Sequence, residues 1–213
     1  FYGINLESLI YDGMLQPSVI TEYLSNGSLR TILYGKKTKT LTPTNKYIIL
    51  LGIANAMKYL HNNNVIHRDL KPDNILLDEN LYPRTCDFGL SRCLPETYSE
   101  SRYLTLTGQI GTILYMAPEL IESESYNEGV DVYAFAIFAN EIISGLKPYP
   151  NLGFFKISKL VTAGGRPDFG DNVTEKMKEL LNKCWSSNIN ERLSFAEIYD
   201  KLSKDFSYFN EEL

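Results

Sequence analysis

Apolar side chains recur every three or four positions in several parts of this 213-residue chain, a period typical of helices with one buried face. The clearest example spans residues 43–60, where Thr42 and Pro43 suit the cap and the first turn of a helix. Residues 130–144 are apolar on most sides and should form a buried helix that ends at Gly145. Similar but shorter patterns predict helices over 29–34, 154–161, 173–185 and 194–206.

Short apolar runs bounded by turn residues predict a few strands, most of them near the front of the chain. Residues 1–23 alternate such runs with Gly and Pro, which indicates two or three strands with turns near 12–13 and 16–17. Residues 75–77 read as a short buried strand, and a second strand should end near Cys86. The chain is therefore expected to be an α+β protein in which helices dominate.

The composition is that of an ordinary globular protein, with 44% hydrophobic and 22% charged residues. The net charge is −5 and no dense block of Lys and Arg occurs, so nucleic acid is not expected as a partner. The longest apolar stretch, 132–143, is interrupted by Asn140 and Glu141 and is too short to be a membrane segment.

The three cysteines, Cys86, Cys93 and Cys184, form no pair with metal-binding spacing. Reduced thiols are typical of the cytoplasm, which we expect to be the location. No basic segment followed by an apolar one occurs at the start, so no signal peptide is expected. Because the first residue is Phe1 and not Met, the sequence is expected to be a piece of a longer protein.

Residues 66–74 concentrate more chemistry than any other stretch: a histidine, two cations, two carboxylates and an amide. Pro72 and Asn74 favour a loop over a helix interior. Such a stretch could be a solvated, charged turn. However, a dense polar group directly before a buried strand seldom serves packing alone.

Three further features give this loop a context. The string His67-Arg68-Asp69-Leu70-x-x-x-Asn74 is followed by Asp87-Phe88-Gly89 and then by Ala117-Pro118-Glu119. This ordered set resembles the catalytic loop and activation segment of protein kinases. The resemblance implies a kinase-like α+β fold in which residues 1–23 are the last strands of the small lobe and the start of the hinge. Residues 24–213 would then be the large, mostly helical lobe.

The resemblance also implies roles for the polar side chains. Asp69 would accept the proton of the substrate hydroxyl, and Lys71 would meet the γ-phosphate of ATP. Asn74 and Asp87 would bind Mg²⁺, a hard cation that prefers oxygen ligands. For each residue alone, a surface charge would be the simpler interpretation, but the ordered set favours the kinase roles.

The adenine of ATP would meet the hinge. On this resemblance Thr21 is the gatekeeper, the backbones of Glu22 and Leu24 face the adenine edge, and Leu76 contributes to the ATP site. Taken alone, residues 21–29 are equally well explained as an ordinary turn between a strand and a helix.

Other residues would have structural or regulatory roles. Asp131 would accept hydrogen bonds from the backbone of the catalytic loop, although a simple helix cap is the alternative. Glu119 would pair with Arg192, with the reservation that the family usually has Pro where Leu193 follows. His67 and Phe88 would pack in a hydrophobic spine.

Arg68 would bind a phosphate on the activation loop and order it. The candidate phosphorylation sites are Ser99, Ser101, Thr105 and Thr107. Thr112 would bond to Asp69 and Lys71, as in kinases that act on Ser and Thr. Residues 131–135 and 194–198 resemble the tyrosine-kinase-like group of these enzymes, so the expected partner is a protein with a Ser or Thr hydroxyl.

Two expected kinase features do not occur in this sequence. It contains no Gly-x-Gly-x-x-Gly, and its first lysine is Lys36, which follows the proposed hinge. The chain by itself is therefore expected to be inactive and to expose apolar surface where a small lobe would sit. A pseudokinase or binding module remains an alternative function. A small-molecule phosphotransferase is disfavoured by the Ala117-Pro118-Glu119 segment, which builds a platform for protein substrates.

Overall fold

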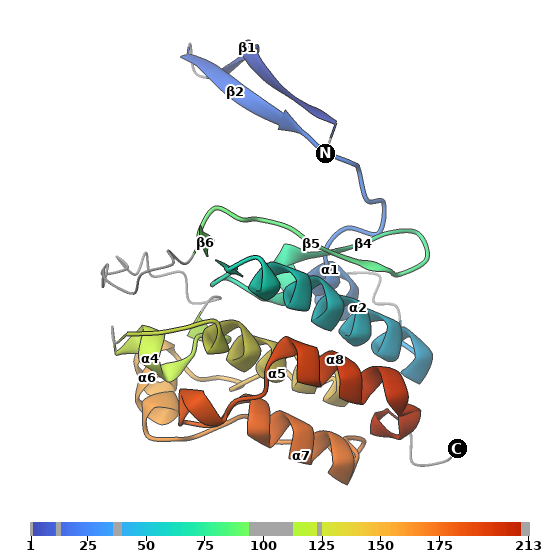
Figure 1. Cartoon of the computed structure of the whole chain (residues 1–213), viewed down its shortest axis with the longest axis vertical. Helices are drawn as coiled ribbons and strands as arrows, with labels where there is room; N and C mark the ends of the chain where they lie inside the picture. Colours follow the sequence, from blue (N-terminus) through green and yellow to red (C-terminus); the bar gives the residue numbers. More distant parts are fainter. Residues whose placement is uncertain (1, 12–13, 36–39, 94–112, 123–124, 210–213) are drawn as a thin grey trace.

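The structure is a computed structural model that describes residues 2–11, 14–35, 40–93, 113–122 and 125–209. A two-stranded hairpin is followed by an extended segment that leads into a helical body (Figure 1). The helical body contains most of the buried apolar side chains. As predicted, the fold is α+β with helices dominant.

The hairpin consists of β1 (Gly3–Tyr11) and β2 (Met14–Ile20), which pair antiparallel. The prediction of a turn near 16–17 was wrong, because Gln16 pairs with Leu9 in the middle of the hairpin. A proline is tolerated there because, among the described strands, β2 pairs with β1 alone and so has one edge that needs no backbone donor. The other predicted turn, at 12–13, lies outside the described residues.

The predicted helices all form, with ends that differ by a few residues. The observed helices are α1 (Leu29–Tyr34), α2 (Pro43–Asn62), α4 (Pro118–Ile121), α5 (Gly129–Ser144), α6 (Phe154–Thr162), α7 (Glu175–Cys184) and α8 (Phe195–Lys204). Three short 3₁₀ turns accompany them: η1 (Pro72–Asn74), η2 (Ile189–Glu191) and η3 (Phe206–Tyr208). The four-residue helix α4 was not predicted, since so short a segment has no apolar period.

Helix α5 is the centre of the helical body, as its apolar sequence predicts. Every residue from Gly129 to Ile143 is buried. In Figure 1, α2 lies on one side of this helix and α7 lies on the other, while α8 runs between them and packs against α2. Helices α4 and α6 lie near the beginning of α5. The helix ends at Gly145, whose φ of 73° is a left-handed conformation that glycine adopts without strain.

Helix α2 contacts β3 and β5, two strands next to the catalytic loop. It begins as predicted, with a Thr42 cap and Pro43 in the first turn. Its buried face includes Ile49 and Ile53. Gly52 allows a close approach to β5, because a Cβ at this position would lie 2.6 Å from Cγ of Pro83.

Two small strand pairs frame the catalytic loop. β3 (Val65–Ile66) leads into it and pairs with β6 (Arg92–Cys93), while β4 (Ile75–Leu77) leaves it and pairs with β5 (Pro83–Thr85). Strands β4 and β5 occur where the sequence predicts them. Strand β6 was not predicted, because two residues are too few for a pattern. Residues 94–112, which follow β6, lie outside the described residues.

Candidate active site

The loop between β3 and β4 has an unusual backbone that the residues beneath it stabilise. Arg68 has a φ of 66° and Asp87, which lies next to the loop, has a φ of 62°. Both are left-handed conformations that cost energy for residues other than glycine. Strain of this kind persists only where the surroundings determine the conformation, and at Arg68 the carboxylate of Asp131 does so.

Asp131, in the first turn of α5, is 1% exposed and accepts three hydrogen bonds. The backbone N–H groups of His67 and Arg68 donate to its two oxygens, each at 2.8 Å. Nε2 of His61 lies 3.0 Å from Oδ2. Asp131 therefore accepts hydrogen bonds from the backbone of the catalytic loop, as the resemblance implied.

His61, the third partner of Asp131, was not predicted to belong to this site. A signal was present, since His61 is four residues after the buried Met57 and so continues the apolar face of α2. Its ring also packs edge to face on Phe195 of α8, with centroids 5.0 Å apart. His61 thus connects two helices to the base of the loop.

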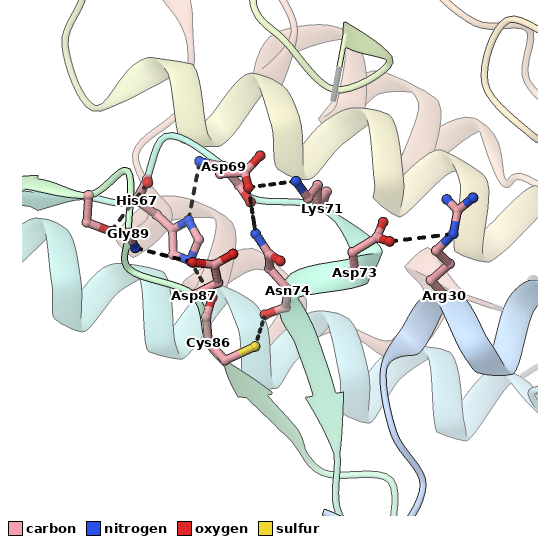
Figure 2. Close-up of polar contacts among 10 residues, drawn as sticks. Arg30, His67, Asp69, Lys71, Asp73, Asn74, Cys86, Asp87 and Gly89 are labelled. Atoms are coloured by element: carbon pink, nitrogen blue, oxygen red, sulfur yellow. Dashed lines mark hydrogen bonds and ion pairs between the residues drawn. The ribbon is translucent and has the colours of Figure 1, made fainter. Parts of the chain in front are cut away.

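Asp69 contacts Lys71 and Asn74 of the same loop (Figure 2). Its Oδ2 accepts from Nζ of Lys71 at 2.6 Å and from Nδ2 of Asn74 at 2.9 Å. Nδ2 of Asn74 also donates to the Asp69 carbonyl at 2.8 Å. The second carboxylate oxygen, Oδ1, is buried and has no hydrogen-bond partner among the described residues. A buried lone pair of this kind is costly unless a ligand uses it.

Asp87 is joined to Asn74 through the backbone of its neighbour. The Cys86 N–H donates to the Asn74 carbonyl at 2.9 Å, so Asp87 follows directly after a residue bonded to Asn74. Oδ1 of Asp87 accepts from the Gly89 N–H at 3.3 Å. The three predicted residues Asp69, Asn74 and Asp87 are therefore gathered at one site, as Figure 2 shows.

His67 and Phe88 pack together behind this site, with ring centroids 5.2 Å apart. Nε2 of the His67 ring also lies 3.1 Å from the Cys86 carbonyl oxygen. His67 is fully buried, whereas 47% of the Phe88 surface is exposed. The expectation that both belong to a hydrophobic spine is therefore met by His67 and only partly by Phe88.

The guanidinium of Arg68, which was predicted to bind a phosphate, contacts protein groups in this structure. Its Nε donates to the Leu90 carbonyl, and its Nη1 donates to the hydroxyl of Tyr126 at 2.9 Å. Tyr126 was not singled out in the sequence. The proposed phosphorylation sites and Thr112 lie outside the described residues.

The predicted hinge residues are less closely tied to the site. Thr21 and Glu22 are exposed and Leu24 is half-buried in the segment that leads from β2 to α1. Leu76 is half-buried in β4, where it forms an isolated bridge with Ser28. Of these four residues, only Leu76 belongs to an element that borders the catalytic loop.

Glu119 and Arg192 form a buried, bidentate ion pair. The guanidinium nitrogens of Arg192 lie 2.6 and 2.9 Å from the two carboxylate oxygens of Glu119. Arg192 also donates to the Gly129 carbonyl, at 2.9 Å, and stacks over the Tyr133 ring, 5.2 Å from its centroid. The presence of Leu193 instead of Pro does not prevent this pairing, which joins α4 to the beginning of α5 and the residues before α8.

The arrangement suits a metal that arrives with a phosphate ligand. No group of three His, Cys, Asp or Glu side chains that could hold a metal occurs in the described part of the chain. Asp87 and Asn74 offer carboxylate and amide oxygens, which suit a hard divalent cation whose other ligands are phosphate oxygens and water. The residues present therefore fit a nucleotide-bound metal better than a metal held by protein alone.

None of the described helices is long and apolar enough to cross a membrane.

Comparison with known proteins gives a consistent result. Residues 4–202 match the family described as protein tyrosine and serine/threonine kinase. The chain is 40% identical over 191 residues to serine/threonine-protein kinase VIK of Arabidopsis thaliana, a match that covers 87% of this chain and 43% of that protein. It is 38% identical over 204 residues to a probable LIM domain-containing serine/threonine-protein kinase of Dictyostelium discoideum, covering 96% and 30%.

The Arabidopsis serine/threonine-protein kinase STY46 is also similar, at 33% identity over 195 residues, which cover 91% of this chain and 33% of that protein. The chain thus spans less than half the length of each of these three relatives. A match over most of the chain, together with a catalytic loop of kinase type, shows the family. The chain belongs to the protein tyrosine and serine/threonine kinases, and its relatives include kinases of the tyrosine-kinase-like group.

Proposed function

We propose that the protein containing this chain transfers the γ-phosphoryl group of ATP to serine or threonine hydroxyls of other proteins. The observation that carries the proposal is the carboxylate of Asp69. One of its oxygens is held by Lys71 and Asn74, and the other is buried without a partner among the described residues. A carboxylate so arranged suits a substrate hydroxyl that donates to Oδ1.

The reaction uses these groups as follows. The hydroxyl oxygen forms a bond to the γ-phosphorus while the bond from that phosphorus to the β,γ-bridging oxygen breaks. Oδ1 of Asp69 orients the hydroxyl and accepts its proton. Lys71, as a compact cation beside Asp69, stabilises the negative charge on the phosphoryl oxygens.

Asn74 and Asp87 would hold Mg²⁺ through their side-chain oxygens. When bound, the ion would neutralise phosphate charge and orient the phosphoryl group. The backbone of Asp87 supports this role, because its positive φ and the Gly89 N–H fix the direction of its carboxylate. Nδ2 of Asn74 is engaged by Asp69, which leaves the amide oxygen for the metal.

Serine and threonine specificity is supported by Lys71 and by the three relatives described above, which are named serine/threonine-protein kinases. We assign residues 1–23 to the end of a small lobe and the start of a hinge, and residues 24–213 to the large lobe. Thr21, Glu22, Leu24 and Leu76 would contact the nucleotide base. The three free cysteines agree with a cytoplasmic location.

A pseudokinase or binding module is the second candidate. These residues include no Gly-x-Gly-x-x-Gly and no lysine before Lys36. These 213 residues alone would then bind ATP weakly and transfer phosphate slowly or not at all. The retention of Asp69, Asn74 and Asp87 favours the active kinase, because a binding module needs none of them for packing.

Two substitutions in the intact protein separate the candidates. Asp69→Asn should lower kcat about a thousandfold or more and leave the affinity for ATP almost unchanged, since Asp69 acts on the hydroxyl. Asp87→Asn should weaken Mg²⁺-dependent ATP binding. Wild-type protein that binds Mg-ATP but phosphorylates no serine or threonine protein would favour the binding module instead.

A further inference from the structure

Helix α1 places a basic side chain beside the catalytic loop. Figure 2 shows the polar groups in a row, from Asp87 through Asp69 and Lys71 to Asp73 and finally Arg30. Asp73 lies four residues after Asp69, and its Oδ1 is 3.5 Å from Nε of Arg30. A polypeptide whose hydroxyl lies at Asp69 would therefore have flanking residues near the Asp73–Arg30 pair.

The helix that carries Arg30 is firmly anchored. Leu29 is fully buried and Ile32 is 4% exposed. At its beginning Ser28 accepts from the Thr31 N–H, and at its end the hydroxyl of Tyr34 donates to Glu141 of the buried helix α5. The backbone of Arg30 is thus held in place, so its charge stays close to Asp73 even when the side chain moves.

The pair itself is open to solvent, unlike the buried pair of Glu119 and Arg192. The side chains of Arg30 and Asp73 are 45% and 40% exposed. Exposed ion pairs contribute little stability, so either partner can exchange its contact for one with a charged ligand. While both are present, however, their charges cancel at this part of the surface.

The neighbouring acid cannot substitute for Asp73. Glu141 is 1% exposed, and its two carboxylate oxygens accept from the hydroxyls of Tyr34 and Tyr115. The guanidinium of Arg30 also lies 5.9 Å from the centre of the Tyr34 ring. Asp73 is therefore the acid in this group that a ligand can reach, and Arg30 is its counter-charge.

We propose that Arg30 is a specificity-determining residue that cancels the charge of Asp73, so that the protein discriminates little between acidic and basic residues beside the phosphorylated hydroxyl. This inference rests on the proposed function for the position of the peptide. Removal of Arg30 should unmask a preference for basic flanking residues. Removal of the Asp73 charge should unmask the opposite preference.

The test uses serine peptides in which one flanking position at a time carries Arg, Ala or Glu. Their dissociation constants are measured by fluorescence anisotropy with the intact protein, and kcat/KM is measured in parallel. Arg30→Ala should shift the preference about three- to fivefold toward Arg peptides at the responsive position, and Asp73→Asn should shift it by a similar factor toward Glu peptides. Parallel shifts in the two variants, or no shift in either, would overturn the proposal.

A matched control is the exposed pair of Lys204 and Asp200 on α8, which lie 3.0 Å apart. Lys204→Ala removes a similar charge and should leave the peptide preference unchanged. A folding defect would weaken binding of all peptides alike, whereas the proposal predicts shifts of opposite sign. Opposite shifts in binding without any turnover would support this inference and count against the proposed function.

Discussion

The two sides of the catalytic loop treat their carboxylates differently. Beneath the loop, Asp131 is buried and accepts three hydrogen bonds, so its bonding capacity is used by the protein itself. Above the loop, Asp69 keeps a buried oxygen without a partner among the described residues, and Asp73 pairs with the exposed Arg30. The acid that stabilises the fold has both oxygens engaged in hydrogen bonds within the protein, whereas the acids assigned to function can still accept a hydrogen bond or a charge from a ligand.

The largest loss of stability should come from Glu119, another buried acid whose oxygens are bonded within the protein, here by Arg192. Arg192→Ala leaves the buried carboxylate of Glu119 without its cation and should cost about 3–5 kcal/mol in unfolding free energy. Urea denaturation measures this value. As the exposed counterpart, Lys204→Ala should cost about 0.5 kcal/mol or less. Equal losses in the two variants would break the distinction between the pairs.

A smaller effect is expected at His61. The substitution His61→Phe preserves an aromatic ring against Phe195 but removes one hydrogen bond to Asp131, and should cost about 1–2 kcal/mol. If the loop depends on this bond, kcat should also fall while ATP binding is retained. The exposed Tyr59 on the same helix provides the control, since Tyr59→Phe should change stability by about 0.5 kcal/mol or less. A His61→Phe protein as stable as the control would show that Asp131 needs only its backbone donors.

The smallest expected effect is a dependence of stability on pH that arises from Glu141. Both carboxylate oxygens of this buried acid accept hydrogen bonds, and the donors are the hydroxyls of Tyr34 and Tyr115. Burial raises the pKa of Glu141 from its ordinary 4.5, while the Tyr34 and Tyr115 hydroxyls and the charges of Arg30 and Lys147 oppose the rise. With a raised pKa in the folded state, the unfolded chain loses its proton first as pH rises. The contribution of this group to stability is therefore full at low pH and declines as pH rises from about 4.5 to the folded pKa.

The substitution Glu141→Gln removes this ionisation and leaves an acceptor for a phenol. The variant should gain stability relative to wild type as pH rises through that interval, and the difference should then level off. This difference is measured from the unfolding free energies of both proteins at a series of pH values from about 4 to 8, roughly the span of the titration. A difference that does not change with pH would contradict the raised pKa.

The comparison also explains what the sequence predicts well. The helices, the Thr42 cap and the buried character of α5 follow from local patterns, which a chain expresses within a few residues. The grouping of Asp69, Asn74 and Asp87 was predicted from motif order, and the structure gathers them. These residues lie in or next to the loop between β3 and β4, and the two strands fix where this loop begins and ends.

The missed features depend on partners distant in sequence. His61 meets Asp131 across 70 positions, and Tyr34 meets Glu141 across 107. The apolar face of α2 indicates that His61 is buried, but no local pattern reveals the partner of either residue, because these contacts arise only when α5 brings several elements together. The wrong turn near 16–17 has a different origin: Pro17 usually indicates a turn, but a strand with an unpaired edge accepts it.

The most direct test measures stability and turnover for the single variant Asp69→Asn. Because this substitution replaces an incompletely bonded buried carboxylate with an amide of the same shape, the unfolding free energy should change by about 1 kcal/mol or less, while phosphoryl transfer falls about a thousandfold or more. A loss of stability as large as that of Arg192→Ala, or phosphoryl transfer at the wild-type rate, would contradict the account.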